Sequence, residues 1–101
     1  MVPQPMAHPH LVAPLQAAIA VELRHVRAAI EGLAEMLVGD EDFVNRYLEQ
    51  FQAFDMLVQC TDESAALLDR LAVGRDPHDA VDSVRLGTVQ QRLRVALAEA
   101  A

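Results

Sequence analysis

Apolar residues recur at spacings of three and four along the first part of the chain. The members of this row are Leu15, Ile19, Leu23, Val26, Ile30, Leu33 and Leu37. Such spacing is the heptad repeat of a coiled-coil seam, in which one helix packs along another. Pro14 suits the first turn of a helix, and Gly39 can supply the left-handed residue that ends one. The pattern predicts a helix over residues 14–38.

A second row of the same kind follows after a short break. Its members are Val44, Tyr47, Phe51, Phe54, Val58, Thr61, Ala65 and Leu68, and beside it lies a further apolar row of Leu48, Leu57, Leu67 and Leu71. Together they predict one long helix over residues 41–73, with an apolar surface wide enough for more than one neighbouring helix. Asp40 stands at the N-cap position, so the two helices should form a tight antiparallel hairpin.

A third, shorter helix is expected over residues 77–98. Asp76 takes its N-cap position and Pro77 its first helical position. Its apolar face comprises Val81, Val84, Val89, Leu93 and Leu97. No segment shows the period-two alternation of a β-strand. The sequence therefore predicts an all-α fold, consisting of a long antiparallel helical hairpin and a shorter third helix.

The chain of 101 residues has room for one domain. Residues 1–13 contain Pro3, Pro5 and Pro9 and are expected to form a flexible, extended tail, because proline disfavours helix at the residue before it. Residues 14–101 then form a single helical domain. The third helix covers only part of the hairpin's seam, and two hairpins would bury the rest as a four-helix bundle. We therefore expect a homodimer, with a compact monomeric three-helix bundle as the alternative.

Composition and charge exclude several classes of function. The chain has 15 carboxylates and 8 basic side chains, all of them arginine, for a net charge of −7. Such a chain repels the phosphate backbone, so no nucleic-acid binding is expected. No apolar run reaches the roughly 18–20 residues of a membrane span, and no basic start marks a secretory signal. The single cysteine, Cys60, excludes an internal disulfide, and we expect a cytoplasmic protein without membrane contact.

The negative charge is concentrated in the predicted middle helix. Residues 40–74 carry eight carboxylates against Arg46 and Arg70. Six polar side chains share the outer face of this helix: Glu49, Gln52, Asp55, Gln59, Asp62 and Glu63. The face is interpreted either as an ordinary solvated surface or as a docking surface for a basic partner protein.

One pair of residues has the spacing of metal ligands on a helix. Glu22 and His25 are three residues apart, and ferritin-like bundles hold metal ions with such Glu-x-x-His pairs on facing helices. The chain has one such pair, beside the seam, and a dimer would duplicate it. An ordinary surface histidine is the alternative interpretation, and no cofactor is expected.

Asp55 and Gln59 are four residues apart and so lie side by side on a helix. A carboxylate beside an amide can orient a water molecule for attack on a phosphoryl group held by another protein. Residues 51–59, FQAFDMLVQ, resemble the active helix of the chemotaxis phosphatase CheZ family, whose members form long hairpins that dimerise into four-helix bundles. The family usually has threonine and glycine where this chain has Leu57 and Val58.

The resemblance implies a mechanism in bacterial signalling. Gln59 would enter the active site of a phosphorylated response regulator and position the water, while Asp55 would contact a lysine of that partner. The leading hypothesis is nevertheless a small dimeric regulatory or adaptor protein that acts through protein–protein interaction. The phosphatase is the alternative, and a ferritin-like metal-binding bundle is a third interpretation.

Overall fold

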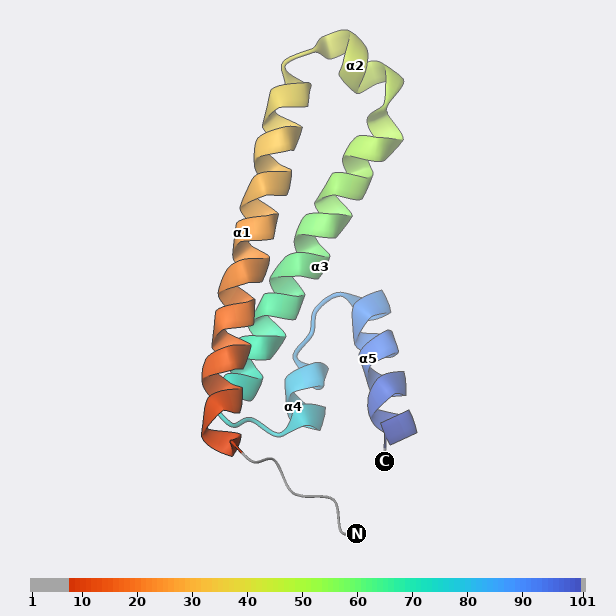
Figure 1. Cartoon of the computed structure of the whole chain (residues 1–101). Helices are drawn as coiled ribbons and strands as arrows, with labels where there is room; N and C mark the ends of the chain where they lie inside the picture. The colour runs from red at the N-terminus through yellow and green to blue at the C-terminus, as the bar shows by residue number, and fades with distance from the viewer. Residues whose placement is uncertain (1–7, 101) are drawn as a thin grey trace.

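The protein is built around two long antiparallel helices that pack along each other (Figure 1). The computed structural model describes residues 8–100, and within them every regular element is a helix, as the sequence predicts. Helix α1 spans Val12–Val38 and α3 spans Leu48–Ala72. The shorter elements are η1 (Pro9–Leu11), α2 (Glu41–Arg46), α4 (Pro77–Asp82) and α5 (Gly87–Ala100). None of the helices in this part of the chain has the length and apolar character needed to cross a membrane.

Helix α1 begins earlier than the sequence indicates. Residues 8–13 were expected to belong to an extended tail, but Pro9–Leu11 form a 3₁₀ turn and α1 starts directly after it, at Val12. Pro9 and Pro14 fit in these first turns, because the amide hydrogens of a helix's first turn have no partner within the helix and proline has no amide hydrogen. The rest of the predicted tail, residues 1–7, lies outside the described residues.

The glycine in the turn of the hairpin does not have the predicted backbone conformation. Gly39 has a φ of −65°, so it is right-handed and not the left-handed residue expected there. The Asp40 cap is confirmed, because its Oδ1 accepts the backbone N–H of Phe43 at 3.1 Å. This cap fixes the start of α2, which lies across the end of the hairpin and joins α1 to α3 (Figure 1).

The helix predicted over residues 41–73 is broken at Tyr47. The backbone there has φ −122° and ψ 33°, outside the helical region, and this residue separates α2 from α3. The break brings three rings together: Phe43 lies 4.6 Å from Tyr47 and 5.9 Å from Phe51, centroid to centroid. Both distances are typical of favourable aromatic pairs, so ring contacts accompany the loss of helical geometry.

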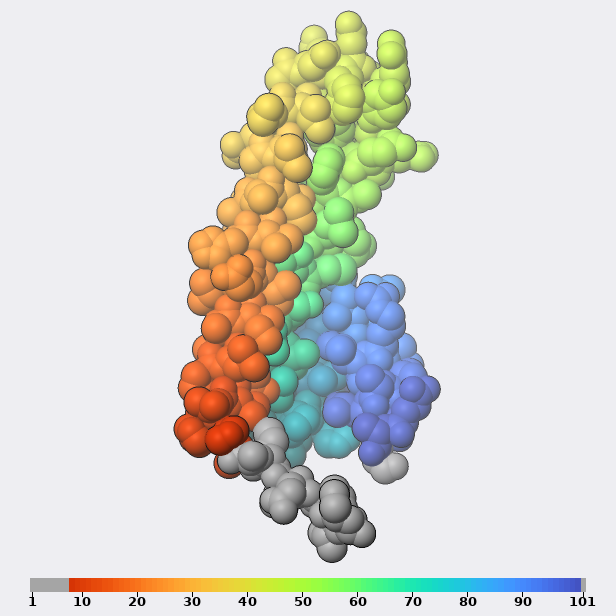
Figure 2. Space-filling model, viewed as in Figure 1, coloured from red at the N-terminus to blue at the C-terminus, as the bar shows by residue number. Residues whose placement is uncertain are grey.

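Small residues form the centre of the interface between α1 and α3. Ala20 and Ala65 are completely buried, whereas no large side chain of the described residues is. Alanine lets helix backbones approach closely but contributes little apolar area. The hairpin is therefore a slender rod with a thin core (Figure 2).

The single third helix predicted over residues 77–98 is two helices, α4 and α5, separated by residues 83–86. Side chains from elsewhere supply the hydrogen bonds that the break leaves open. Glu63 of α3 accepts the backbone N–H of Arg85 at 2.9 Å, and the side-chain amide of Gln90 donates to the carbonyl oxygens of Val81 and Asp82. α5 consequently folds back against α4, and both lie beside the lower half of the hairpin (Figures 1 and 2).

Helix α4 depends on its N-cap, because it has only six residues. Gly74, with φ +86°, turns the chain after α3, and Asp76 Oδ1 then accepts the backbone N–H of His78 at 2.9 Å. We expect Asp76→Ala to lower the free energy of unfolding by about 1 kcal/mol, because the backbone N–H groups of His78 and Asp79 both lose their acceptor. Urea unfolding followed by circular dichroism measures this. Asp79→Ala is the matched control, because it removes a carboxylate of the same turn that caps no amide, and an equal loss in both variants would contradict the capping role.

Candidate functional site

Asp55 and Gln59 lie one turn apart on α3, and both side chains are exposed. Neither forms a hydrogen bond or an ion pair with another described residue, so both are available to a partner. They nevertheless line different hollows. Asp55 borders a hollow between α1 and α3, whereas Gln59 borders a second one between α3 and the segment that joins α4 to α5.

The hollow at Asp55 has an acidic rim and an apolar floor, and we call it the acidic hollow. Its volume is about 450 Å³, and carboxylates of Glu31, Glu35 and Asp55 line it together with the side chains of Phe54 and Val58. Of the three carboxylates, that of Glu31 also pairs with Arg27 at 3.0 Å. A cationic side chain with an apolar stem, such as lysine or arginine, matches this combination.

The acidic face predicted on the middle helix is divided by the fold. Glu49, Gln52, Asp55 and Gln59 are exposed on α3. Asp62 is also exposed but pairs with Arg27 at 3.2 Å, and Glu63 is half-buried and holds the backbone of Arg85. The last two carboxylates are thus engaged within the molecule.

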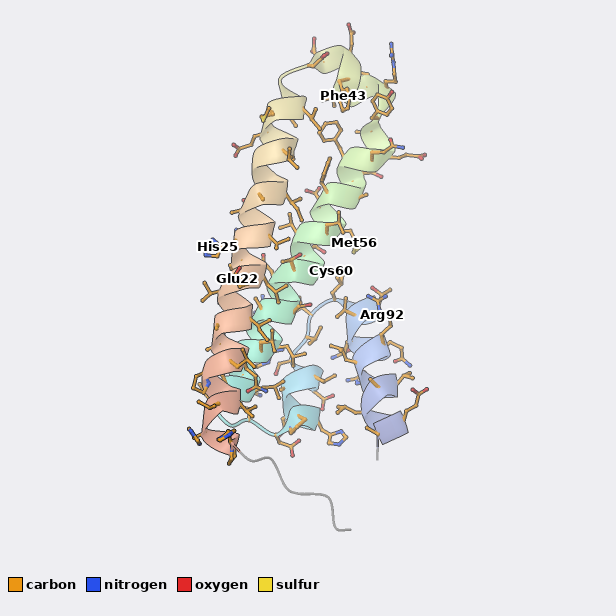
Figure 3. The ribbon with its side chains drawn as sticks, in the orientation of Figure 1. Glu22, His25, Phe43, Met56, Cys60 and Arg92 are labelled. Carbon is orange, nitrogen blue, oxygen red and sulfur yellow. The ribbon has the colours of Figure 1, made fainter. Side chains whose placement is uncertain are left out.

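Glu22 and His25 are both exposed on α1. Figure 3 shows His25 directed away from α3. Residues 8–100 contain no group of three or more histidine, cysteine or acidic side chains placed to hold a metal ion. The structure therefore brings no further ligand to this pair within the described chain.

The sequence predicts that part of the hairpin's apolar seam stays exposed, but not which residues of α1 do. Leu15, Ile19, Val26 and Leu33 were expected to face the second helix, but between 41% and 61% of each is exposed, and we call these four residues the apolar stripe. Leu23, Ile30 and Leu37 of the same predicted seam are half-buried. The row that faces α3 most directly includes Ala13, Ala20 and Ala34, whose spacing in multiples of seven was the available signal.

The two edges of the α1–α3 interface differ in chemistry. Arg24 of α1 pairs with Asp69 of α3 at 2.6 Å, and Arg27 pairs with Asp62, so ion pairs follow one edge. The apolar stripe follows the other edge, because Val26 and Arg27 are separated by about 100° around the helix. By the same geometry exposed Leu57 of α3 lies on the stripe's side of the hairpin, away from α4. The stripe side of the hairpin is thus exposed and largely apolar along α1, with Glu22 as the charged residue among its members.

Comparison of the chain with family models, with curated proteins and with solved structures finds no match.

Proposed function

We propose that the protein is a dimeric helical adaptor that regulates another protein by binding it. The observation that carries this proposal is the apolar stripe of Leu15, Ile19, Val26 and Leu33. These four residues belong to the heptad row of α1, and the rest of the described chain leaves between 41% and 61% of each exposed. A heptad row exposed on a long helix is typical of a surface that packs against further helices. A second copy of the chain offers the same row, which satisfies the self-complementarity of a two-fold interface.

The size of the uncovered side supports a second copy as its occupant. Helix α1 has 27 residues. At about 1.5 Å per residue it is roughly 40 Å long, and two helices side by side are about 20 Å wide. The resulting face of about 800 Å² equals what each partner contributes to a stable interface of standard size. Burial of this face would also supply the large apolar contacts that the core of one chain lacks.

The acidic hollow is the surface that best suits the binding of the partner protein. It lies on the other edge of the hairpin, so dimerisation through the stripe leaves it open. Its carboxylates and apolar side chains favour a basic segment of the partner, and Glu49 extends the negative charge along α3. We place this interaction in the cytoplasm, where a lone cysteine such as Cys60 stays reduced.

The solution mass of the full chain tests the dimer. Light scattering should give twice the 11.1 kDa of one chain, independent of salt, because the proposed interface is apolar. A mass of one chain at concentrations of about 100 µM, where even a weak adaptor dimer would form, would contradict the proposal.

A second candidate function is the CheZ-like phosphatase. The observation that favours it is the exposure of both Asp55 and Gln59 on α3 of a long hairpin, with Asp55 at a hollow suited to a lysine. In this proposal Gln59 orients the attacking water, and Asp55 binds the cation of a phosphorylated response regulator.

The variant Gln59→Ala separates the two functions. If the phosphatase proposal holds, the rate of dephosphorylation of a response regulator should fall about 100-fold or more, while binding of the regulator changes little. Gln52→Ala, two turns earlier on the same exposed face, is the matched control and should leave the rate unchanged. Absence of any acceleration by the wild-type chain would exclude the phosphatase and leave the adaptor.

A further inference from the structure

A second cavity lies between α3 and the segments that flank α4. Its volume is about 640 Å³, within the range of small-molecule sites. Three arginines from separate segments line it: Arg70 from α3, Arg75 from the turn before α4, and Arg85 from the segment before α5. The net charge of the chain is −7, so a gathering of cations at one cavity runs against its overall charge.

These three arginines form no ion pair with a carboxylate of the described residues. The two acidic side chains in the cavity wall are already engaged: Asp62 pairs with Arg27 at 3.2 Å, and Glu63 accepts the backbone N–H of Arg85 at 2.9 Å. The three arginines therefore outnumber the two carboxylates of the cavity wall, and none of the three guanidinium groups is neutralised by an ion pair within residues 8–100.

Arg70 provides an independent indication that an acceptor belongs here. Its Nε donates to the carbonyl oxygen of Ala80 at 3.0 Å, which fixes the guanidinium plane. Its Nη2 is buried and has no hydrogen-bond partner within residues 8–100. A buried donor without an acceptor is costly and rare, so the guanidinium of Arg70, a residue of the cavity wall, still has a donor to satisfy.

We propose that this cavity binds the phosphate group of a small organic phosphate. Arginine is the preferred partner of phosphate, because its planar fork of N–H donors matches two phosphate oxygens at once. A phosphomonoester has three free oxygens and close to two negative charges, enough to engage all three guanidinium groups. The Gln59 amide lines the same cavity and supplies a further hydrogen-bond donor. The remaining volume accommodates the organic part of the ligand.

Calorimetric titration of the full chain tests this proposal. Inorganic phosphate and glucose 6-phosphate are the probes, with acetate as the carboxylate comparison, all at one ionic strength. We expect saturable binding of inorganic phosphate, binding of glucose 6-phosphate at least as tight, and weaker binding of acetate. Failure of both phosphates to bind would overturn the proposal, equal binding of acetate would overturn the assignment to phosphate, and failure of glucose 6-phosphate alone would overturn the assignment to an organic phosphate.

Arg85→Gln shows whether the cavity is the place of binding. It should weaken phosphate binding about tenfold or more, since a charge-assisted hydrogen bond is lost while the backbone N–H that holds Glu63 remains. Arg46→Gln is the matched control, because it removes the same charge at the opposite end of the hairpin and should leave the affinity unchanged. Equal weakening in both variants would mean attraction by overall charge and would overturn the site.

A second measurement keeps the test valid if a variant folds poorly. In the wild-type chain, phosphate should shift the backbone amide resonances of residues 83–86 and of Arg75, and acetate should shift them less. Shifts confined to other helices would contradict the proposal. The mass of the chain is measured separately, so failure here leaves the dimer proposal standing.

Discussion

Val26→Glu should reduce the solution mass of the protein from two chains to one. Val26 lies near the middle of the apolar stripe and is 50% exposed in the single chain, so the variant has little reason to misfold. In the dimer the added carboxylate would lie in an apolar interface, and the two-fold axis introduces it twice. An unpaired carboxylate buried in an apolar interface costs at least about 2 kcal/mol, so two copies should weaken the dimer about a thousandfold.

The control for this variant is Val21→Glu. Val21 is 49% exposed and lies on the same helix, but about 140° away from Val26 around its axis. Light scattering over a dilution series should find the Val21 variant dimeric wherever the wild-type chain is, and the Val26 variant monomeric. If both variants behave like wild type, the stripe is not the contact between the copies.

Ala20→Leu should destabilise the hairpin more than any surface change. Ala20 has no exposed area and faces α3, and it lines neither of the two hollows described above. A leucine there forces the two helices apart and should lower the free energy of unfolding by about 1–3 kcal/mol. Urea unfolding at one protein concentration measures it, so that any dimer contributes equally to both curves.

Ala28→Leu makes the same substitution on the exposed side of α1, away from the apolar stripe. Leucine and alanine have similar helix propensities, so this variant should unfold within about 0.5 kcal/mol of wild type. Equal stability of the two leucine variants would show that α1 and α3 do not approach closely at Ala20.

The first residues of α2 and α4 could be predicted from local signals. The caps of Asp40 and Asp76 are side-chain-to-backbone contacts over two or three residues, and the structure confirms both. The break at residues 83–86 could not be predicted this way. It is stabilised by Glu63, which is 22 positions from Arg85, and no periodic pattern contains a contact of that range.

The faces of α1 were harder to predict than its length. A heptad row shows that a helix has an apolar side, but not which neighbour covers it. Leu23 and Val26 belong to one row in the sequence, yet the first packs inward and the second is half exposed, because alanines occupy the line of closest approach to α3. The exposure of Asp55 could be predicted, because the polar residues Gln52 and Gln59 share its face of the helix. The acidic hollow could not be predicted, because Glu31 and Glu35 join it from another helix.

The order of the helices in space follows their order in the chain. α1 packs on α3, α3 on α4, and α4 on α5, while α1 has its main contacts within the hairpin. During synthesis the hairpin can therefore close as soon as Ala72 has left the ribosome, before the last two helices exist. Each later helix finds its docking surface already formed.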